Sequence, residues 1–258
     1  MAAELVTLER LPEERIAVVT IDRPPLNAID RRLAEELGAA IAELAGDAQT
    51  RAVVVRSGVE GAFMVGADIN EFQRVDAANV AEVARGQELT NALAELPSPT
   101  VAAINGHALG GGFELALACD FRFAARGAGF VGLPEVRLGL IPGAGGTQRL
   151  TRLVGAAKAT LLVMKGLQLS PEEAEREGIV HFVVEPGELD EQARDFAVRL
   201  ARQAPLALRA IKRAIRAAGT PEGYAIEREA FRELILSEDA RAGVAAFLGG
   251  ERAVFEGH

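Results

Sequence analysis

Two glutamates, Glu114 and Glu135, have the surroundings that acid–base chemistry requires. Glu114 follows three successive glycines, residues 110–112, and Glu135 lies in an otherwise apolar stretch between Pro134 and Pro142. A carboxylate with apolar neighbours is desolvated, which raises its pKa and lets it hold or give a proton near neutral pH. Two such groups facing one cavity would also repel, which spreads their pKa values further. The pair predicts proton transfer, and a structural, hydrogen-bonded role for each glutamate is the alternative.

The segment before Glu114 is suited to bind developing negative charge. Residues 105–120 read NGHALGGGFELALACD, so a glycine triplet opens a short apolar helix. Glycine lets the backbone approach a ligand closely, and a helix start leaves free N–H groups that favour negative charge. Such a preorganised donor lowers a barrier by about 3–4 kcal/mol. The segment therefore predicts half an oxyanion hole, with close helix–strand packing as the alternative. The loop 61–70, GAFMVGADIN, is a weaker second candidate.

Other kinds of site find little support in the sequence. No Gly-x-Ser-x-Gly elbow and no Gly-Lys-Ser/Thr phosphate loop occurs. Residues 127–132, GAGFVG, match a dinucleotide pattern, but Pro134 interrupts the helix that must follow and no acid occurs between Val136 and Ser170. We therefore expect no nicotinamide cofactor. The histidines are too scattered for a paired metal site: His107, His181 and His258.

The elements that must position these residues are strands and helices in alternation. β-Branched runs at 6–9 and 16–21 predict a hairpin. Apolar spacing from Ile29 to Leu44 predicts a helix closed by Gly46. The remaining expected elements follow in chain order: strand 52–55, helix 80–96, strand 101–104, loop 106–112, helix 113–118, a strand–loop unit 121–134, a helix starting at Ser170, strand 179–184, and helices from 189 with breaks near Pro205, Pro221 and Ser237. This order predicts the α/β class with a helical C-terminal section.

Composition limits the function classes further. The chain has 258 residues, 49% hydrophobic, and a net charge of −9, which argues against a broad nucleic-acid surface. No apolar stretch reaches the roughly 20 residues of a membrane span, and the N-terminus lacks the features of a secretory signal. The single cysteine, Cys119, cannot form an intrachain disulfide, which favours a reducing, cytoplasmic setting.

One stretch of the chain is basic despite the overall acidity. It reads either as a solvated face with subunit contacts or as a local field for a phosphorylated ligand. Its cations are Arg137, Arg149, Arg152, Lys158 and Lys165.

The three segments, in this order, resemble the crotonase superfamily, and enoyl-CoA hydratases most closely. The patterns Asn-Gly-x-Ala-x-Gly-Gly-Gly-x-Glu and Pro-Glu-x-x-x-Gly-x-x-Pro-Gly-x-Gly-Gly carry the likeness, which runs from residues 23–28 to residues 245–248. The resemblance implies a crotonase-like spiral of ββα turns over residues 1–195, containing the active site. It also implies a helical C-terminal region, 196–258, that mediates a homotrimer or a hexamer built from two trimers.

The resemblance also implies an acyl-CoA thioester substrate and a role for each matching residue. Glu114 would activate water for attack at the β-carbon, Glu135 would deliver the α-proton, and the Gly143 N–H would help place the water. The N–H groups of Ala67 and Gly111 would form the oxyanion hole. No metal and no redox cofactor are expected, since coenzyme A is part of the substrate. The residues expected to contact coenzyme A are Leu26, Ala28, Val65, Ala67, Asp68, Ile69, Asn70, Pro134 and Phe247.

Three departures from the family pattern leave alternatives open. Asn70 stands where many relatives have lysine, and residues 249–252, GGER, replace a lysine-rich run, so Arg252 and the basic middle segment are expected to meet the phosphates instead. The spacing from Glu114 to Glu135 is one residue longer than in well-known hydratases. The rival reactions are Δ3-Δ2 enoyl-CoA isomerisation and other crotonase chemistry. A non-catalytic or RNA-binding homologue is opposed by the acidic balance.

Overall fold

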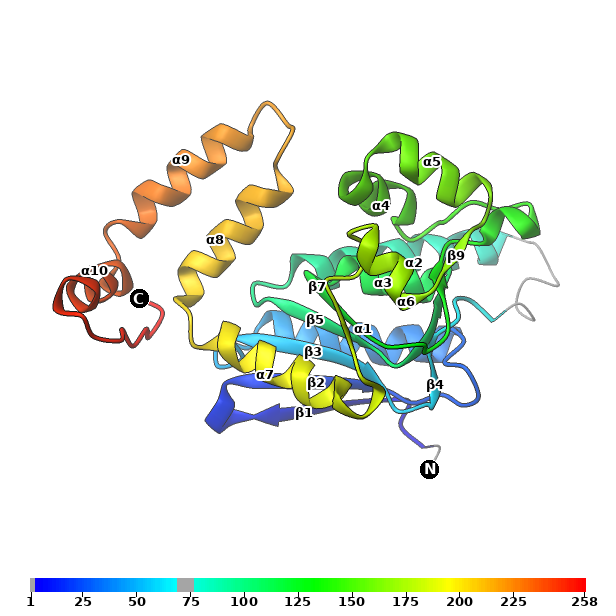
Figure 1. The fold of residues 1–258 in the computed structure, drawn as a ribbon, viewed down its shortest axis with the longest axis horizontal. Helices are drawn as coiled ribbons and strands as arrows, with labels where there is room; N and C mark the ends of the chain where they lie inside the picture. Colours follow the sequence, from blue (N-terminus) through cyan, green and yellow to red (C-terminus); the bar gives the residue numbers. More distant parts are fainter. Residues whose placement is uncertain (1–2, 69–76) are drawn as a thin grey trace.

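A computed structural model describes residues 3–68 and 77–258, in which two sheets are wrapped by helices (Figure 1). Within these residues the larger sheet has the order β1-β2-β3-β5-β7-β10, and the smaller has the order β4-β6-β8-β9. The strands of the larger sheet are β1 (Val6–Leu11), β2 (Ile16–Ile21), β3 (Ala52–Ser57), β5 (Thr100–Ile104), β7 (Phe121–Ala125) and β10 (Phe182–Val184). Those of the smaller sheet are β4 (Gly61–Met64), β6 (Gly106–Leu109), β8 (Val131–Gly132) and β9 (Gln168–Leu169).

The larger sheet is parallel apart from β1, and helices cover both of its faces. Strands buried on two faces read as continuous apolar runs, as β3 does. Val53 and Val55 lie in the core cluster that includes α1 and α3, whereas Ala52 and Val54 lie in the cluster that includes α7. The antiparallel pairing of β1 with β2 confirms the predicted hairpin.

The predicted helices occur in the predicted order and with several of the predicted ends, whereas the two helices between residues 146 and 164, α4 and α5, were not predicted. The bounds are α1 (Arg31–Ala45), α2 (Ala77–Glu95), α3 (Gly111–Ala118), α4 (Gly146–Val154), α5 (Ala156–Met164), α6 (Pro171–Arg176), α7 (Leu189–Ala201), α8 (Pro205–Arg216), α9 (Gly223–Leu234) and α10 (Glu238–Gly249). Gly46 is the C-cap of α1, as expected. Ser170 and Glu173 form a capping box at the start of α6, which confirms that helix start.

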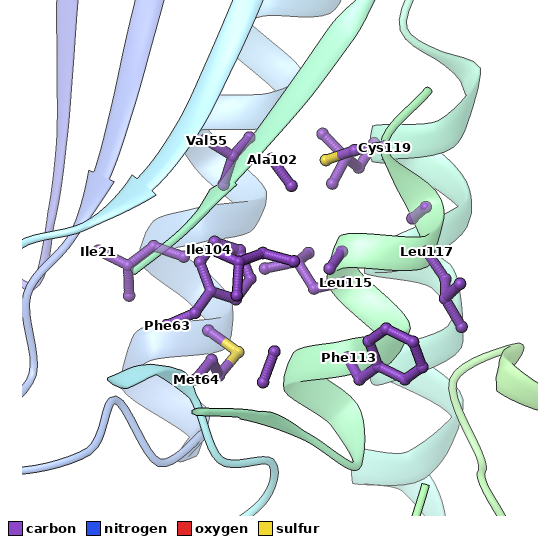
Figure 2. Packing of buried hydrophobic residues seen from close by; sticks show 14 of the residues in the cluster. Ile21, Val55, Phe63, Met64, Ala102, Ile104, Phe113, Leu115, Leu117 and Cys119 are labelled. Carbon is purple, nitrogen blue, oxygen red and sulfur yellow. The ribbon is translucent and has the colours of Figure 1, made fainter. Parts of the chain in front are cut away.

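The short helix α3 is buried in the middle of the larger core cluster. Leu115 and Cys119 point from it toward Ala102 and Ile104 of β5 (Figure 2). The first turn of α3 also lies directly on β4, since a Cβ at Gly112 would stand 2.1 Å from the Met64 carbonyl oxygen. This contact explains one glycine of the triplet by packing alone.

Two segments predicted as loops contain strands. Gly106–Leu109 forms β6 and pairs in parallel with β4, Gly61–Met64, so α3 begins at Gly111 rather than at residue 113. These strands are short and rich in small residues, so the sequence carries no strand periodicity there, and backbone pairing across the turn of the spiral decides the structure. The strand predicted at 179–184 is also shorter, Phe182–Val184.

Helices α8, α9 and α10 form an arm that extends away from the two sheets (Figure 1). The boundary predicted between residues 195 and 196 falls inside α7, whose Ala193, Ala197 and Ala201 pack against the larger sheet. The arm exposes large apolar side chains: Ile211, Ile215, Tyr224, Phe231, Ile235, Leu236, Val244, Phe247 and Leu248. In the described ranges, no helix combines the length and apolarity needed to cross a membrane.

Candidate active site

The structure brings Glu114 and Glu135 to one place from different elements. Glu114 lies in the first turns of α3, and Glu135 begins the 3-10 helix η3, Glu135–Leu138. The Oε1 atom of Glu135 reaches back to the start of α3, only 3.3 Å from where a Cβ of residue 110 would stand. Glu114 N–H donates to the carbonyl of the same residue, Gly110, so the two glutamates are neighbours, and the charge of Glu114 raises the pKa of Glu135.

Glu114 is held by two backbone amides. The residue is 2% exposed, and its Oε1 accepts hydrogen bonds from Ala144 N–H and Gly146 N–H, each at 2.7 Å. These amides belong to the turn of residues 143–146 that opens α4, which we call the clamp turn. Burial raises the pKa of Glu114, while the two amides and the Arg149 guanidinium oppose the rise. Donors aimed at one oxygen favour the ionised carboxylate.

Glu135 has the opposite surroundings. Its Oε2 is buried and has no hydrogen-bond partner among the described residues. Burial, and to a smaller extent the neighbouring Glu114 charge, raise the pKa of Glu135 to about 7, while a hydrogen bond from its own backbone opposes the rise. A carboxyl group in this state is protonated through much of the neutral range, so it has a proton to give.

The two N–H groups predicted for the oxyanion hole lie on adjacent backbone segments. Ala67 forms a parallel bridge with Ile29 in which Ile29 N–H donates to Gly66 and Asp68 N–H donates to Ile29. The N–H of Ala67 itself therefore points away from Ile29. Gly111 is the first residue of α3, and a Cβ at Gly66 would stand 3.2 Å from its nitrogen. Both N–H groups therefore lie where the two segments meet.

Five of the residues predicted to contact coenzyme A, Ala67 among them, lie on two neighbouring segments, 26–28 and 65–68. Val65 N–H donates to the Leu26 carbonyl at 3.3 Å, and Leu26 is 44% exposed. The Arg23 guanidinium bonds the Ala28 carbonyl at 2.9 Å and Asp68 at 3.3 Å.

Asn27, which sequence reasoning missed, fixes this pair of segments. It is fully buried with a φ of 52°, and its amide donates to the Phe63 carbonyl and to Ser57 Oγ. Its side-chain oxygen accepts from the backbone N–H of Arg23. An asparagine with a positive φ and a hydrogen-bonded side-chain amide indicates a loop of fixed conformation. The partners of this amide could be identified only from the structure.

The other predicted site residues are placed as follows. Pro134 directly precedes Glu135 as the N-cap of η3, and Gly143 directly precedes the amide of Ala144 that binds Glu114. Phe247 lies on α10, 84% exposed and, within one chain, in the arm far from α3 (Figure 1). Ile69 and Asn70 lie outside the described residues.

Sequence reasoning named Gly143 in the clamp turn but missed Ala144 and Gly146, whose amides contact Glu114. The signal for them was the glycine-rich run 143–146 itself. A Cβ at Gly146 would stand 2.9 Å from Glu114 Oε1, so glycine at this position lets the carboxylate reach the backbone.

Part of the basic stretch is occupied within the protein. Arg137 donates to the Gly166 carbonyl at 2.9 Å, and Lys158 pairs with Glu177. Arg149 points inward and bonds Asn91 and the Ala144 carbonyl. The GAGFVG pattern, residues 127–132, continues into β8 and then η3 instead of a helix, and Gly129 packs against the backbone of His107.

Known proteins share both the sequence and this architecture. A family model described as enoyl-CoA hydratase/isomerase matches residues 12–258. The chain is 39% identical over 257 residues to the short-chain-enoyl-CoA hydratase of Clostridium acetobutylicum, an alignment that covers 98% of this chain and 97% of that protein. It is 43% identical over 246 residues to the human enoyl-CoA hydratase domain-containing protein 2, mitochondrial, covering 92% of this chain and 84% of that protein.

The fold is likewise that of solved structures. The crystal structure of enoyl-CoA hydratase from Bacillus anthracis matches with a TM-score of 0.92 at 35% identity, covering 98% of this chain and all of that one. Two sheets, the helices around them and the C-terminal arm therefore form the crotonase fold. Given the match along nearly its whole length, the chain is an enzyme of the enoyl-CoA hydratase/isomerase family.

Proposed function

We propose that this enzyme adds water reversibly across the 2,3 double bond of a 2-enoyl-CoA thioester. The observation that carries the proposal is the different surroundings of two neighbouring carboxyl groups. Glu114 accepts two amide hydrogen bonds on one oxygen, whereas Glu135 has a buried oxygen without a partner in the described part of the chain and a pKa of about 7. One group is suited to accept a proton and the other to donate one.

The proposed reaction assigns one step to each group. The Glu114 carboxylate takes a proton from water as the water oxygen attacks C3. The electron pair of the double bond moves toward the thioester, whose oxygen becomes an enolate anion next to the N–H groups of Ala67 and Gly111. Glu135 then gives its proton to C2. The sum is one water added, and the enzyme resets when a proton returns from Glu114 to Glu135.

The same proposal places coenzyme A along the segments that carry Leu26, Ala28, Val65 and Asp68, with Pro134 beside the acyl group. Backbone continuity supports this placement, because Ala67 lies on one of these segments. Contacts from Ile69, Asn70 and Phe247 stay predictions, as do the role of Gly143 in placing water and the cytoplasmic location. No metal or redox group enters any step of the proposed reaction.

We further propose a homotrimer or a hexamer built from two trimers, formed through the arm. Its support is the row of exposed apolar side chains on α8–α10, which a monomer would leave in water. Light scattering of the purified protein tests the proposal, and a mass of three or six chains is expected. A monomer at micromolar concentration would contradict it.

The test of the reaction is the ultraviolet absorbance of crotonyl-CoA mixed with the purified enzyme, with the product identified by mass. We expect cofactor-free loss of the conjugated enone and a product heavier by one water. If crotonyl-CoA stays unchanged while coenzyme A binding is intact, the hydratase assignment is wrong. In that case 3-enoyl-CoA becomes the substrate to test, since family members also isomerise.

A further inference from the structure

Arg149 lies directly behind the turn that binds Glu114. Its Nη1 donates to the Ala144 carbonyl at 2.7 Å, and its Nη2 donates to Asn91 Oδ1 at 2.6 Å. The guanidinium rests against Gly145, where a Cβ would stand 2.1 Å from Nη1. Gly145 has a φ of 95°, a conformation that glycine adopts without strain. The side chain thus joins the start of α4 to α2 across the clamp turn.

A second side chain contacts the same carbonyl. Thr90 of α2 is 3% exposed, and its hydroxyl is 2.7 Å from the Ala144 carbonyl oxygen. Arg149 Nη1 is 3.2 Å from Thr90 Oγ1, so the hydroxyl accepts from the guanidinium while it donates to the carbonyl. Ala144 therefore has its carbonyl bound on one side of the turn and its N–H bound to Glu114 on the other.

We infer that Arg149 is a positioning residue for Glu114, one that fixes the clamp turn through the Ala144 carbonyl and places a cation behind the carboxylate. This inference rests on the proposed function of Glu114 as the base that activates water. Arg149 does not need to touch the substrate for this role. It acts through the two amides that set where the carboxylate stands, and a displacement of about 1 Å at such a group costs on the order of 100-fold in rate.

Neighbouring charges influence the pKa values of both Glu114 and Arg149. The Arg149 cation lowers the pKa of Glu114, and the Glu114 charge in turn raises the pKa of Glu135. Arg152 of α4 and Arg216 of α8 act on Arg149 in turn, with a minor contribution from the buried Cys119 thiol. Removing the Arg149 cation therefore raises the pKa of Glu114. The acid limb, which is the low-pH side of the plot of hydration rate against pH, is expected to move to higher pH, because Glu114 must be ionised to take a proton.

Three variants separate the charge from the geometry. Arg149→Gln removes both, and we expect kcat to fall roughly 10–100-fold with little change in KM, because the substrate contacts stay. Arg149→Lys keeps the charge but loses the two guanidinium nitrogens that bind separate partners. We expect kcat to fall less than in Arg149→Gln and the acid limb to stay near its wild-type position. Thr90→Val removes only a hydroxyl and is expected to lower kcat without moving the limb to higher pH. Arg176→Gln, on the exposed face of α6, is the matched control.

A double-mutant cycle with Glu114→Gln tests whether Arg149 acts through the carboxylate. If it does, adding Arg149→Gln to Glu114→Gln changes the residual rate by less than about twofold, because the group that Arg149 positions is no longer a base. An equal loss in both backgrounds would overturn the inference and leave Arg149 as a purely structural residue.

A measurement without substrate keeps the inference independent of the proposed reaction. The carboxyl carbon of Glu114 is titrated by NMR in ¹³C-labelled enzyme, with Glu114→Gln giving the assignment. We expect its midpoint at higher pH in Arg149→Gln than in the wild type or in Arg176→Gln. An unchanged midpoint would overturn the inference even in an active hydratase. If the wild-type enzyme fails to hydrate crotonyl-CoA, the proposed function is wrong. The titration would still measure the effect of Arg149 on the pKa of Glu114.

Discussion

Glu114 is buried and Glu135 is half-buried, and the elements around them give the two carboxyl groups different hydrogen-bond partners. The clamp turn at the start of α4 gives Glu114 two amide donors. The 3-10 turn that carries Glu135 leaves one of its oxygens buried with no partner in the described residues. Desolvation is the largest influence on the pKa of both groups, and it is opposed by two backbone hydrogen bonds at Glu114 and by one from its own backbone at Glu135. The contrast teaches that backbone donors, acting against the burial of both groups, distinguish the proposed base from the proposed acid.

The largest expected effect is the loss of either carboxyl group. Glu114→Gln and Glu135→Gln are each expected to lower the kcat of crotonyl-CoA hydration by about 10²–10⁴, the usual scale for a general acid or base. Steady-state rates measured beside Glu191→Gln, an exposed control on α7, check this. Near-wild-type hydration by either variant would remove that residue from its proposed role.

A smaller effect is expected when Glu114 stays but its clamp is disturbed. In Gly146→Ala the new Cβ would stand 2.9 Å from Glu114 Oε1 and from a Leu133 methyl, so the carboxylate or the turn must shift. We expect kcat to fall about 10–100-fold, as for other small displacements of a reacting group.

Gly187→Ala is the control for Gly146→Ala, since nothing lies within 4 Å of its added Cβ. Equal rates for the two alanine variants would show that the clamp turn does not position the base.

The coupling between the two carboxyl groups should be visible as a pH effect. In the hydration direction Glu135 must carry its proton, so kcat is expected to decline as pH rises through about 7. The Glu114 charge raises the pKa of Glu135, so replacing Glu114 with neutral glutamine is expected to lower it. An NMR titration of the labelled Glu135 carboxyl in wild type and Glu114→Gln measures the difference. Identical midpoints would mean that the two groups do not share one space.

The smallest expected effect concerns stability. The folded protein holds the Glu135 pKa at about 7, above the 4.5 of an unperturbed glutamate, so the folded state binds a proton more tightly than the unfolded state. Stability is then lost as pH rises from the lower value through the higher one. Glu135→Gln, which cannot ionise, is expected to melt a few degrees above the wild type at pH 8, with a smaller difference at pH 5. Calorimetry at both pH values checks the sign.

Residue patterns predicted many of the strands and helices, and the elements that they failed to predict have a physical explanation. The apolar runs of β2, β3 and β5 and the capping box at Ser170 are local signals, and the structure confirms them. Strands β4 and β6 were predicted as loops, because small residues that pair along their backbones leave no periodic side-chain pattern. The division between core and arm is likewise a matter of packing, since α7 and α8 read alike as helices.

The sequence by itself determined the family, the α/β class and the two glutamates. The motifs that indicate them are glycines, prolines and carboxylates at fixed spacings within continuous segments of the chain. Only the tertiary structure decided how the glutamates differ. The Ala144 and Gly146 amides lie 30 and 32 residues from Glu114, and Thr90 lies 54 residues from the carbonyl it contacts. Backbone amides carry no residue identity, so a donor supplied by a distant turn leaves almost no trace in the sequence. For the same reason the sequence showed Arg149 only as one cation of a basic stretch and not its partners, a carbonyl and two side chains of another helix.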